Sequence, residues 1–151
     1  MKKLSLLIRK IKTFFKIDFE SKVMFCKAFI LCGFYRFIIL NISFSKVKKL
    51  LGEKGKESDF KIDIEHYKIA KEVGFIVKLA SSHTPWESKC LVQAMTAQKI
   101  LKDKGIKTTL YLGVAKERNN MVAHSWLRYG QMFVTGGNGD LNYTRVGCFA
   151  K

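Results

Sequence analysis

Two residues of this chain, Cys90 and His124, have side chains suited to nucleophilic catalysis. A thiolate attacks carbonyl carbon readily, and an imidazole can take up and return the proton that acyl transfer requires. Cys90 comes near the start of a predicted helix, where unpaired backbone N–H groups favour a thiolate. His124 lies on a predicted strand, with Val122 and Trp126 on its face. Because a helix packed on a sheet can bring two such side chains together, the pair predicts a cysteine-dependent acyl-transfer enzyme.

Cys90 also has a purely structural interpretation, because free cysteines pack readily in protein cores. The other histidines compete weakly as bases, since His66 lies on a charged helix face and His83 in the loop before the Cys90 helix. No CxxC or Cys/His cluster predicts a metal site, so we expect neither a metal nor a cofactor. The remaining cysteines suit core or surface positions better than catalysis: Cys26, Cys32 and Cys148.

The start of the Cys90 helix decides how strongly the helix could activate the thiol. Thr84 begins a capping-box spacing, with Pro85 at the first helical position, while Ser88 is a second candidate cap two residues before Cys90. A start at Ser88 would place Cys90 in the first turn. A start at Thr84 would place it in the second turn, where activation would depend mainly on a nearby imidazole. The helix is expected to stop at Gly105.

The helical spacing of apolar residues predicts that most of the chain before Cys90 is helical. In residues 1–16, Lys and Arg fill the face opposite the apolar residues. This basic amphipathic segment suits docking to anionic lipid or to a partner protein, and equally packing on its own domain. Residues 52–61 are polar and predict a loop between the N-terminal part and the rest. Further helices are predicted over residues 20–40, 44–51 and 64–79.

Beyond Gly105 the pattern changes to β-branched and aromatic residues, which is typical of strands. We therefore expect an α+β fold with a papain- or transglutaminase-like core, in which the nucleophile helix packs on a small antiparallel sheet. A helical N-terminal extension over residues 1–52 would precede a catalytic domain over residues 62–151. Strands are predicted over residues 108–115, 121–129, 132–135 and 143–149, with a glycine-rich loop over 136–140.

Composition narrows the choice of partners. The net charge is +16, from 28 Lys and Arg against 12 Asp and Glu, which favours an acidic partner or surface. No zinc-finger or RNP-type signature is present, so no nucleic-acid binding is expected. Residues 1–16 lack the clean apolar stretch of a secretory signal. Lys27 and Arg36 interrupt the apolar stretch 24–40, which argues against a transmembrane helix. We expect a cytoplasmic protein, peripheral to a membrane where residues 1–16 contact its surface.

Several short motifs occur together in one order along residues 86–137, and this set resembles the lasso-peptide leader peptidases. These are transglutaminase-like cysteine proteases of peptide-antibiotic biosynthesis. The resemblance implies that Cys90 is the nucleophile and His124 the base. The motifs are Pro85-Trp86, Cys90-Leu91 with Ala94, Gly105-Ile106, Leu112-Gly113-Val114 and Ala123-His124-Ser125-Trp126.

The resemblance also implies a reaction and its partners. Such a protease cuts the leader from a ribosomally made precursor peptide, so that an asparagine-synthetase-like cyclase can close the macrolactam on the freed amine. Some members carry a fused leader-recognition domain. This chain has no room for one, which implies a stand-alone protease that depends on a separate leader-recognition protein.

One position departs from the family. Its third catalytic residue is an Asp, and this chain has Gly136 where that Asp is expected, without a side chain to orient an imidazole. Asp140 is the preferred substitute and Asn138 the next, although both are also ordinary loop residues. The oxyanion hole and substrate pocket are assigned to the Cys90 N–H together with Trp86, Trp126 and Asn138.

Two alternatives to the peptidase function stay open. The first is a transglutaminase-like amide transferase or deamidase. The second is a catalytically inactive membrane-associated adaptor, which the missing Asp favours.

Overall fold

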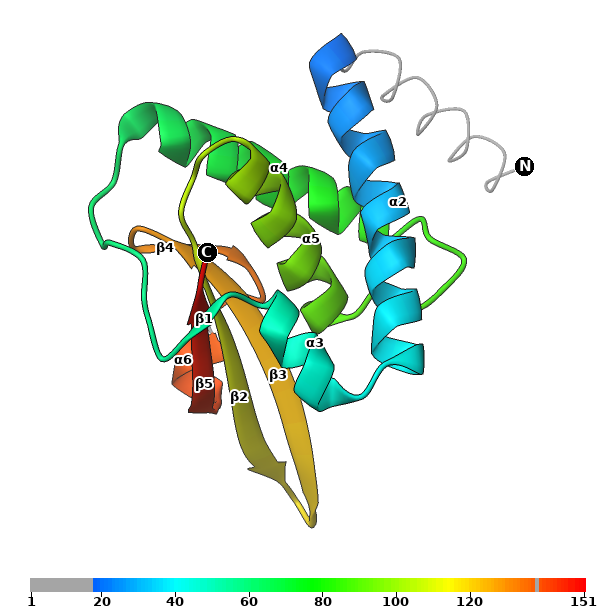
Figure 1. Ribbon diagram of the computed structural model, residues 1–151, viewed down its shortest axis with the longest axis vertical. Helices are drawn as coiled ribbons and strands as arrows, with labels where there is room; N and C mark the ends of the chain where they lie inside the picture. The colour runs from blue at the N-terminus through cyan, green and yellow to red at the C-terminus, as the bar shows by residue number, and fades with distance from the viewer. Residues whose placement is uncertain (1–17, 138) are drawn as a thin grey trace.

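A computed structural model describes residues 18–137 and 139–151 of the chain (Figure 1). The basic segment predicted over residues 1–16 lies outside these residues. The helices over 20–40, 44–51 and 64–79 are confirmed to within two residues at each end. Acidic side chains cap two of them, since Asp18 accepts a hydrogen bond from the Ser21 amide and Asp63 accepts from the His66 amide. The helices are α2 (Phe19–Asn41), α3 (Phe44–Leu50), α4 (Ile64–Ser81), α5 (Cys90–Asp103) and α6 (Gly139–Asn142).

The strands form one antiparallel sheet in the order β1-β5-β2-β3-β4. Two elements lie where the sequence predicted only loop. β1 was missed because its two residues are polar and exposed and therefore show no strand pattern in the sequence. It is a strand only because its backbone pairs with Phe149 and Ala150 of β5. The short α6 occupies the end of the glycine-rich segment. The strands are β1 (Glu53–Lys54), β2 (Thr109–Glu117), β3 (Asn120–Tyr129), β4 (Met132–Thr135) and β5 (Thr144–Ala150).

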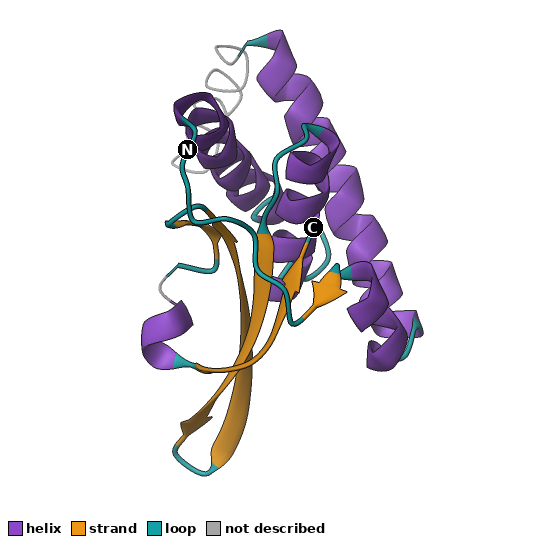
Figure 2. Ribbon diagram, turned by 60° about the vertical axis from the view of Figure 1, so that its left-hand side comes forward, coloured by secondary structure: helices purple, strands orange, loops and turns teal. Residues whose placement is uncertain are grey.

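The main core lies between the sheet and the helices. α5 covers one face of the sheet, while α2 and α4 pack against α5 (Figure 2). Leu110 of β2, Leu127 of β3 and Phe149 of β5 point from the sheet into this core. α6 lies on the other side of the sheet, where it contacts β2 and β3. The α+β fold, with a helix packed on a small antiparallel sheet, is therefore as the sequence predicted.

α2 is part of this core. Its buried residues recur at helical spacing and contact the same cluster as α4 and α5. The helix that the sequence assigned to an N-terminal extension therefore packs with the elements of the predicted catalytic domain. The buried apolar residues of α2 are Met24, Ala28, Cys32, Tyr35 and Ile38.

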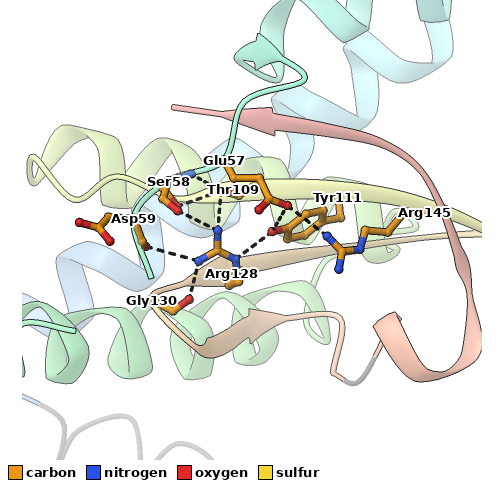
Figure 3. A network of polar contacts seen from close by, with 8 residues as sticks. All are labelled: Glu57, Ser58, Asp59, Thr109, Tyr111, Arg128, Gly130 and Arg145. Atoms are coloured by element: carbon orange, nitrogen blue, oxygen red, sulfur yellow. Dashed lines mark hydrogen bonds and ion pairs between the residues drawn. The ribbon is translucent and has the colours of Figure 1, made fainter. Parts of the chain in front are cut away.

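On the sheet face away from α5, a network of polar contacts surrounds Arg128, which is only 4% exposed (Figure 3). Its guanidinium donates hydrogen bonds to the carbonyl oxygens of Ser58 and Gly130, and to the Tyr111 hydroxyl at 2.9 Å. The ring of Phe60 lies 3.9 Å from the guanidinium carbon. Arg128 thereby ties the segment after β1 to the sheet and supplies hydrogen-bond donors to these buried carbonyl groups.

Candidate active site

Cys90 is the first residue of α5, and the N-cap is Lys89, which makes no side-chain capping bond. Both cap candidates from the sequence were wrong. The Thr84 hydroxyl contacts the Ser88 hydroxyl at 2.9 Å, so the two groups bond within the loop instead of capping the helix. The Ser88 carbonyl accepts a hydrogen bond from the Gln93 side chain at 2.8 Å, which secures the loop against the first turn.

The position of Cys90 suits a nucleophile. Its thiol is free and half-buried, in the first turn of α5, where backbone N–H groups lack intrahelical acceptors and favour an anion. Cys32 provides a contrast within the same chain. It is fully buried against Thr96 of α5, and burial raises the pKa of its thiol. Cys32 is therefore a core residue, as the sequence indicated.

Trp86 lies between the Cys90 loop and α2. Its ring packs edge-on against Phe29 at 5.3 Å between centroids and lies over Gly33, where an added Cβ would come within 2.8 Å of the indole. The indole Nε1 is buried and has no hydrogen-bond acceptor among the described residues. Trp86 thus positions the loop before α5 against α2, and its role in an oxyanion hole stays a prediction.

His124 lies on β3 opposite Gly113 of β2 and is half-buried. Its Nε2 is 2.8 Å from the carbonyl oxygen of Gly136. Because a carbonyl can only accept, Nε2 carries the hydrogen and Nδ1 of the neutral ring is left as the proton acceptor. The imidazole also lies against Tyr143, at 4.9 Å, and Trp126, at 6.1 Å between ring centroids.

Gly136 thus orients the imidazole through its main chain, at the position where the sequence resemblance predicts an Asp. Its φ is +81°, and an added Cβ would come within 2.6 Å of both the Ser125 carbonyl oxygen and Trp126 Cβ. Only glycine fits this close approach. Sequence reasoning missed the contact because it considered side chains, and every residue has the same carbonyl. The adjacent glycines, Gly136 and Gly137, were the available signal for a positive-φ turn beside His124.

The side chains of the two residues that the sequence offered in place of the expected Asp lie outside the described part of the structure. Asp140 lies in α6, but its side chain is outside the described part of the structure, and Asn138 is outside the described residues altogether. Tyr143, which precedes β5 and covers the imidazole, was not singled out from the sequence. An isolated tyrosine before a strand has no pattern that would mark it as a neighbour of His124.

The described structure does not bring Cys90 and His124 together. Side chains alternate between the two faces of a strand, and Leu127 of β3 points into the core beneath α5. The alternation places His124 and Trp126 on the opposite face, and Trp126 stacks there on Tyr111 at 5.6 Å. The polar and ring contacts of His124 come from β3, Gly136 and Tyr143, and none comes from α5.

Comparisons with known proteins identify the domain. A family model described as the transglutaminase-like superfamily matches residues 42–147, which include α5 and most of the sheet. Comparison with curated proteins and with solved structures gave no match. Within residues 18–137 and 139–151, no three His, Cys, Asp or Glu side chains are grouped so that they could hold a metal ion.

Proposed function

Because the chain belongs to the transglutaminase-like superfamily, we propose that it is a cysteine peptidase that removes the leader from a lasso-peptide precursor. Cys90 is the nucleophile and His124 the base. The observation that carries the proposal is the half-buried free thiol of Cys90, at the first residue of a helix packed on an antiparallel sheet, inside the matched region.

The reaction has two steps. The Cys90 thiolate attacks the scissile carbonyl carbon, and the tetrahedral intermediate collapses to a thioester as the leaving amine takes a proton from the imidazolium of His124. Water then attacks the thioester, giving a proton to the same imidazole, and the carboxylate product leaves the regenerated thiol. The backbone N–H of Cys90, with a donor from the Trp86 loop, would bind the oxyanion in both steps.

Catalysis requires the imidazole within about 3 Å of the thiol or of the leaving amine. The hydrogen bond to Gly136 leaves Nδ1 unprotonated, as a general base requires. Because His124 lies on the sheet face away from α5, the peptidase proposal requires that its side chain turn to the α5 face, which a shift of this part of β3 by one residue would do.

The proposed partners follow from the resemblance and from the charge. They are the precursor peptide, a separate leader-recognition protein and an asparagine-synthetase-like cyclase, in the cytoplasm. A net charge of +16 suits an acidic leader or carrier. Residues 1–16, with their interleaved basic and apolar side chains, would add contact with a membrane surface.

One observation favours a second function. His124 and Cys90 lie on different sides of the sheet, and the chain has Gly136 where the family has its third catalytic residue. A catalytically inactive adaptor, which keeps the fold to bind precursor or partner proteins, needs neither the pair nor the Asp. This adaptor is the alternative that the experiments must exclude.

Cleavage of the precursor encoded beside the gene tests the proposal, with the recognition protein present and absent. Wild type should release the leader, and Cys90→Ala and His124→Ala should leave the precursor intact, as read by mass spectrometry. Cys26→Ala is the matched control, because this exposed thiol lies on α2. Cleavage by Cys90→Ala would contradict the assignment of the nucleophile. An intact precursor with wild type, although binding is confirmed, would establish the adaptor.

Alkylation tests the thiol itself without a substrate. Iodoacetamide at neutral pH, followed by peptide mapping, should modify Cys90 faster than the more exposed Cys26, because the N-terminus of α5 favours the anionic, reactive form. Cys32 should react most slowly, because it is buried and its thiol pKa is raised. Modification in order of exposure alone, with Cys26 ahead of Cys90, would remove the support that the helix position provides.

A further inference from the structure

α2 has apolar side chains on both of its faces. One face is buried against α4 and α5, and the opposite face is exposed to solvent, where a soluble helix would present polar residues. We call this exposed face the apolar stripe. The exposed fractions of these residues run from 52% to 78%, so more than half of each is open to solvent within the described structure. The stripe consists of Phe19, Val23, Ile30, Phe34, Phe37 and Leu40.

Beyond its first turn, the charged residues of α2 are Lys27 and Arg36, and both pair with other elements of the domain. Lys27 forms an ion pair with Asp103 of α5 at 2.7 Å, and Arg36 pairs with Glu87 of the Cys90 loop at 3.1 Å. Both side chains are therefore directed toward their own domain. The two residues that argued from sequence against a membrane helix therefore leave the stripe apolar from Val23 to Leu40.

α3 directly follows the C-terminal end of α2 (Figure 1), and the segment also exposes apolar side chains. Ile42, Phe44 and Leu50 are 37%, 47% and 42% exposed, and Lys48 lies 5.3 Å from the centre of the Phe44 ring. Lys46 and Lys49 are exposed on the same short helix. Aromatic and aliphatic side chains beside lysines are typical of a surface that meets the boundary between lipid headgroups and acyl chains.

The charge of this part of the chain is complementary to an anionic surface. Residues 1–50 contain twelve Lys and Arg against two acidic residues, which gives +10 of the chain's +16 in a third of its length. The excess of basic residues therefore gathers in the same part of the chain as the apolar stripe. A hydrophobic protein partner would use the stripe but would leave this charge unexplained.

We propose that the apolar stripe of α2, with α3, docks on the surface of an anionic phospholipid bilayer, with α2 lying in the interface. α2 is long and apolar enough to cross a membrane by length and composition. A spanning arrangement would expose in lipid the face that packs on α4 and α5, and would break the ion pairs of Lys27 and Arg36. The interfacial arrangement keeps that packing. This inference does not depend on the peptidase proposal.

Vesicle co-sedimentation of the full chain tests the docking. The protein should bind vesicles of phosphatidylcholine with 30% phosphatidylglycerol and should bind pure phosphatidylcholine at least tenfold more weakly, because each basic residue near an anionic surface contributes about a fivefold gain in partition. Binding to the anionic vesicles should fall as salt is raised. Equal binding to both vesicles, or none to either, would overturn the proposal.

Substitutions in the apolar stripe test whether the stripe itself, in addition to residues 1–17, contributes to vesicle binding. The triple variant Phe34→Ser, Phe37→Ser and Leu40→Ser should lower the partition coefficient at least tenfold, because it removes apolar area from the docking face. The matched control changes three exposed apolar residues elsewhere and should bind like wild type: Met121→Ser, Leu141→Ser and Val146→Ser. Both variants should keep the wild-type circular dichroism spectrum. Unchanged binding by the stripe variant would overturn the proposal.

A tryptophan introduced into the apolar stripe measures how deeply α2 lies in the bilayer. Phe37→Trp adds a fluorophore to the exposed face, while Trp86 and Trp126 have buried indole nitrogens and provide a constant background. Lipids brominated near the headgroup should quench the introduced indole more strongly than lipids brominated near the chain end. Stronger quenching from the chain end would show a spanning helix and overturn the interfacial arrangement.

Sedimentation velocity without lipid tests whether the apolar stripe binds a second copy of the chain. A dimer that the stripe variant abolishes would assign the stripe to that contact and overturn the docking proposal.

Discussion

His124 donates a hydrogen bond from Nε2 to the main-chain carbonyl of Gly136, across 2.8 Å. A backbone group therefore holds one tautomer of the imidazole, which is the role that the sequence resemblance assigns to an Asp side chain. A carbonyl is uncharged, so it orients the ring but stabilises an imidazolium less than a carboxylate would. Gly136 can approach so closely because it lacks a Cβ.

Gly136→Ala should displace this turn. An added Cβ would clash with the Ser125 carbonyl and with Trp126, in addition to the cost of the positive φ. Gly137→Ala is the matched control, because its φ is also positive at +59° but an added Cβ would meet nothing within 4 Å. Gly136→Ala should therefore lower the free energy of unfolding by about 1–3 kcal/mol more than the control, as measured by urea denaturation.

The same variant should alter the imidazole. In wild type, ¹⁵N NMR of the neutral His124 ring should show Nε2 protonated, because Gly136 accepts that hydrogen. In Gly136→Ala the ring should lose this fixed tautomer, whereas in Gly137→Ala it should keep it. A wild-type spectrum with Nδ1 protonated would contradict the assigned hydrogen bond.

Arg128 should be among the most sensitive positions for stability. Arg128→Met keeps an apolar stem but removes the donors of three buried acceptors, which are the Ser58 and Gly130 carbonyls and the Tyr111 hydroxyl. Each unsatisfied buried polar group costs about 1–3 kcal/mol, so a total loss of about 3 kcal/mol or more is expected in urea denaturation.

Arg145→Met is the control for this effect. The Arg145 side chain is 50% exposed and pairs with Glu57 at 3.1 Å, so its replacement should cost less than about 1 kcal/mol. Equal losses from the two substitutions would show that the buried hydrogen bonds of Arg128 add nothing beyond a surface ion pair.

Tyr111 should make the free energy of unfolding depend on pH in the alkaline range. Burial, above all, raises the pKa of its hydroxyl, which also accepts from Arg128 and donates to Glu57. Because the folded state favours the neutral phenol, this contribution is fully present below the ordinary pKa of about 10 and is lost as pH rises from there through the raised folded pKa. Unfolding free energy should therefore fall above about pH 10.

Tyr111→Phe should show less of this alkaline loss, because it removes the titrating group. The pKa of Tyr35 is also raised by burial, so some alkaline dependence should persist in the variant. Absorbance at 295 nm should find one fewer tyrosine that titrates late. Identical alkaline slopes in wild type and variant would refute the role of Tyr111.

The fold was largely predictable because its signals are local. Apolar spacing predicted α2 and α4 to within two residues of their ends, and β-branched runs predicted β2, β3 and β5. The failures share a cause. β1 exists only through its pairing with β5, and the cap of α5 was missed because the Thr84 and Ser88 hydroxyls bond to each other. Such partnerships depend on loop geometry, which residue types do not specify.

The candidate site divides in the same way. From the sequence alone, Cys90 was identified near the start of a helix and His124 on a strand with Trp126 on its face, because both statements depend on periodicity. Tertiary structure alone decided which sheet face α5 covers, and so on which side His124 lies, because that depends on how whole layers pack. Tertiary structure also chose the Gly136 carbonyl as the partner of the imidazole, since a backbone oxygen leaves no mark in the sequence.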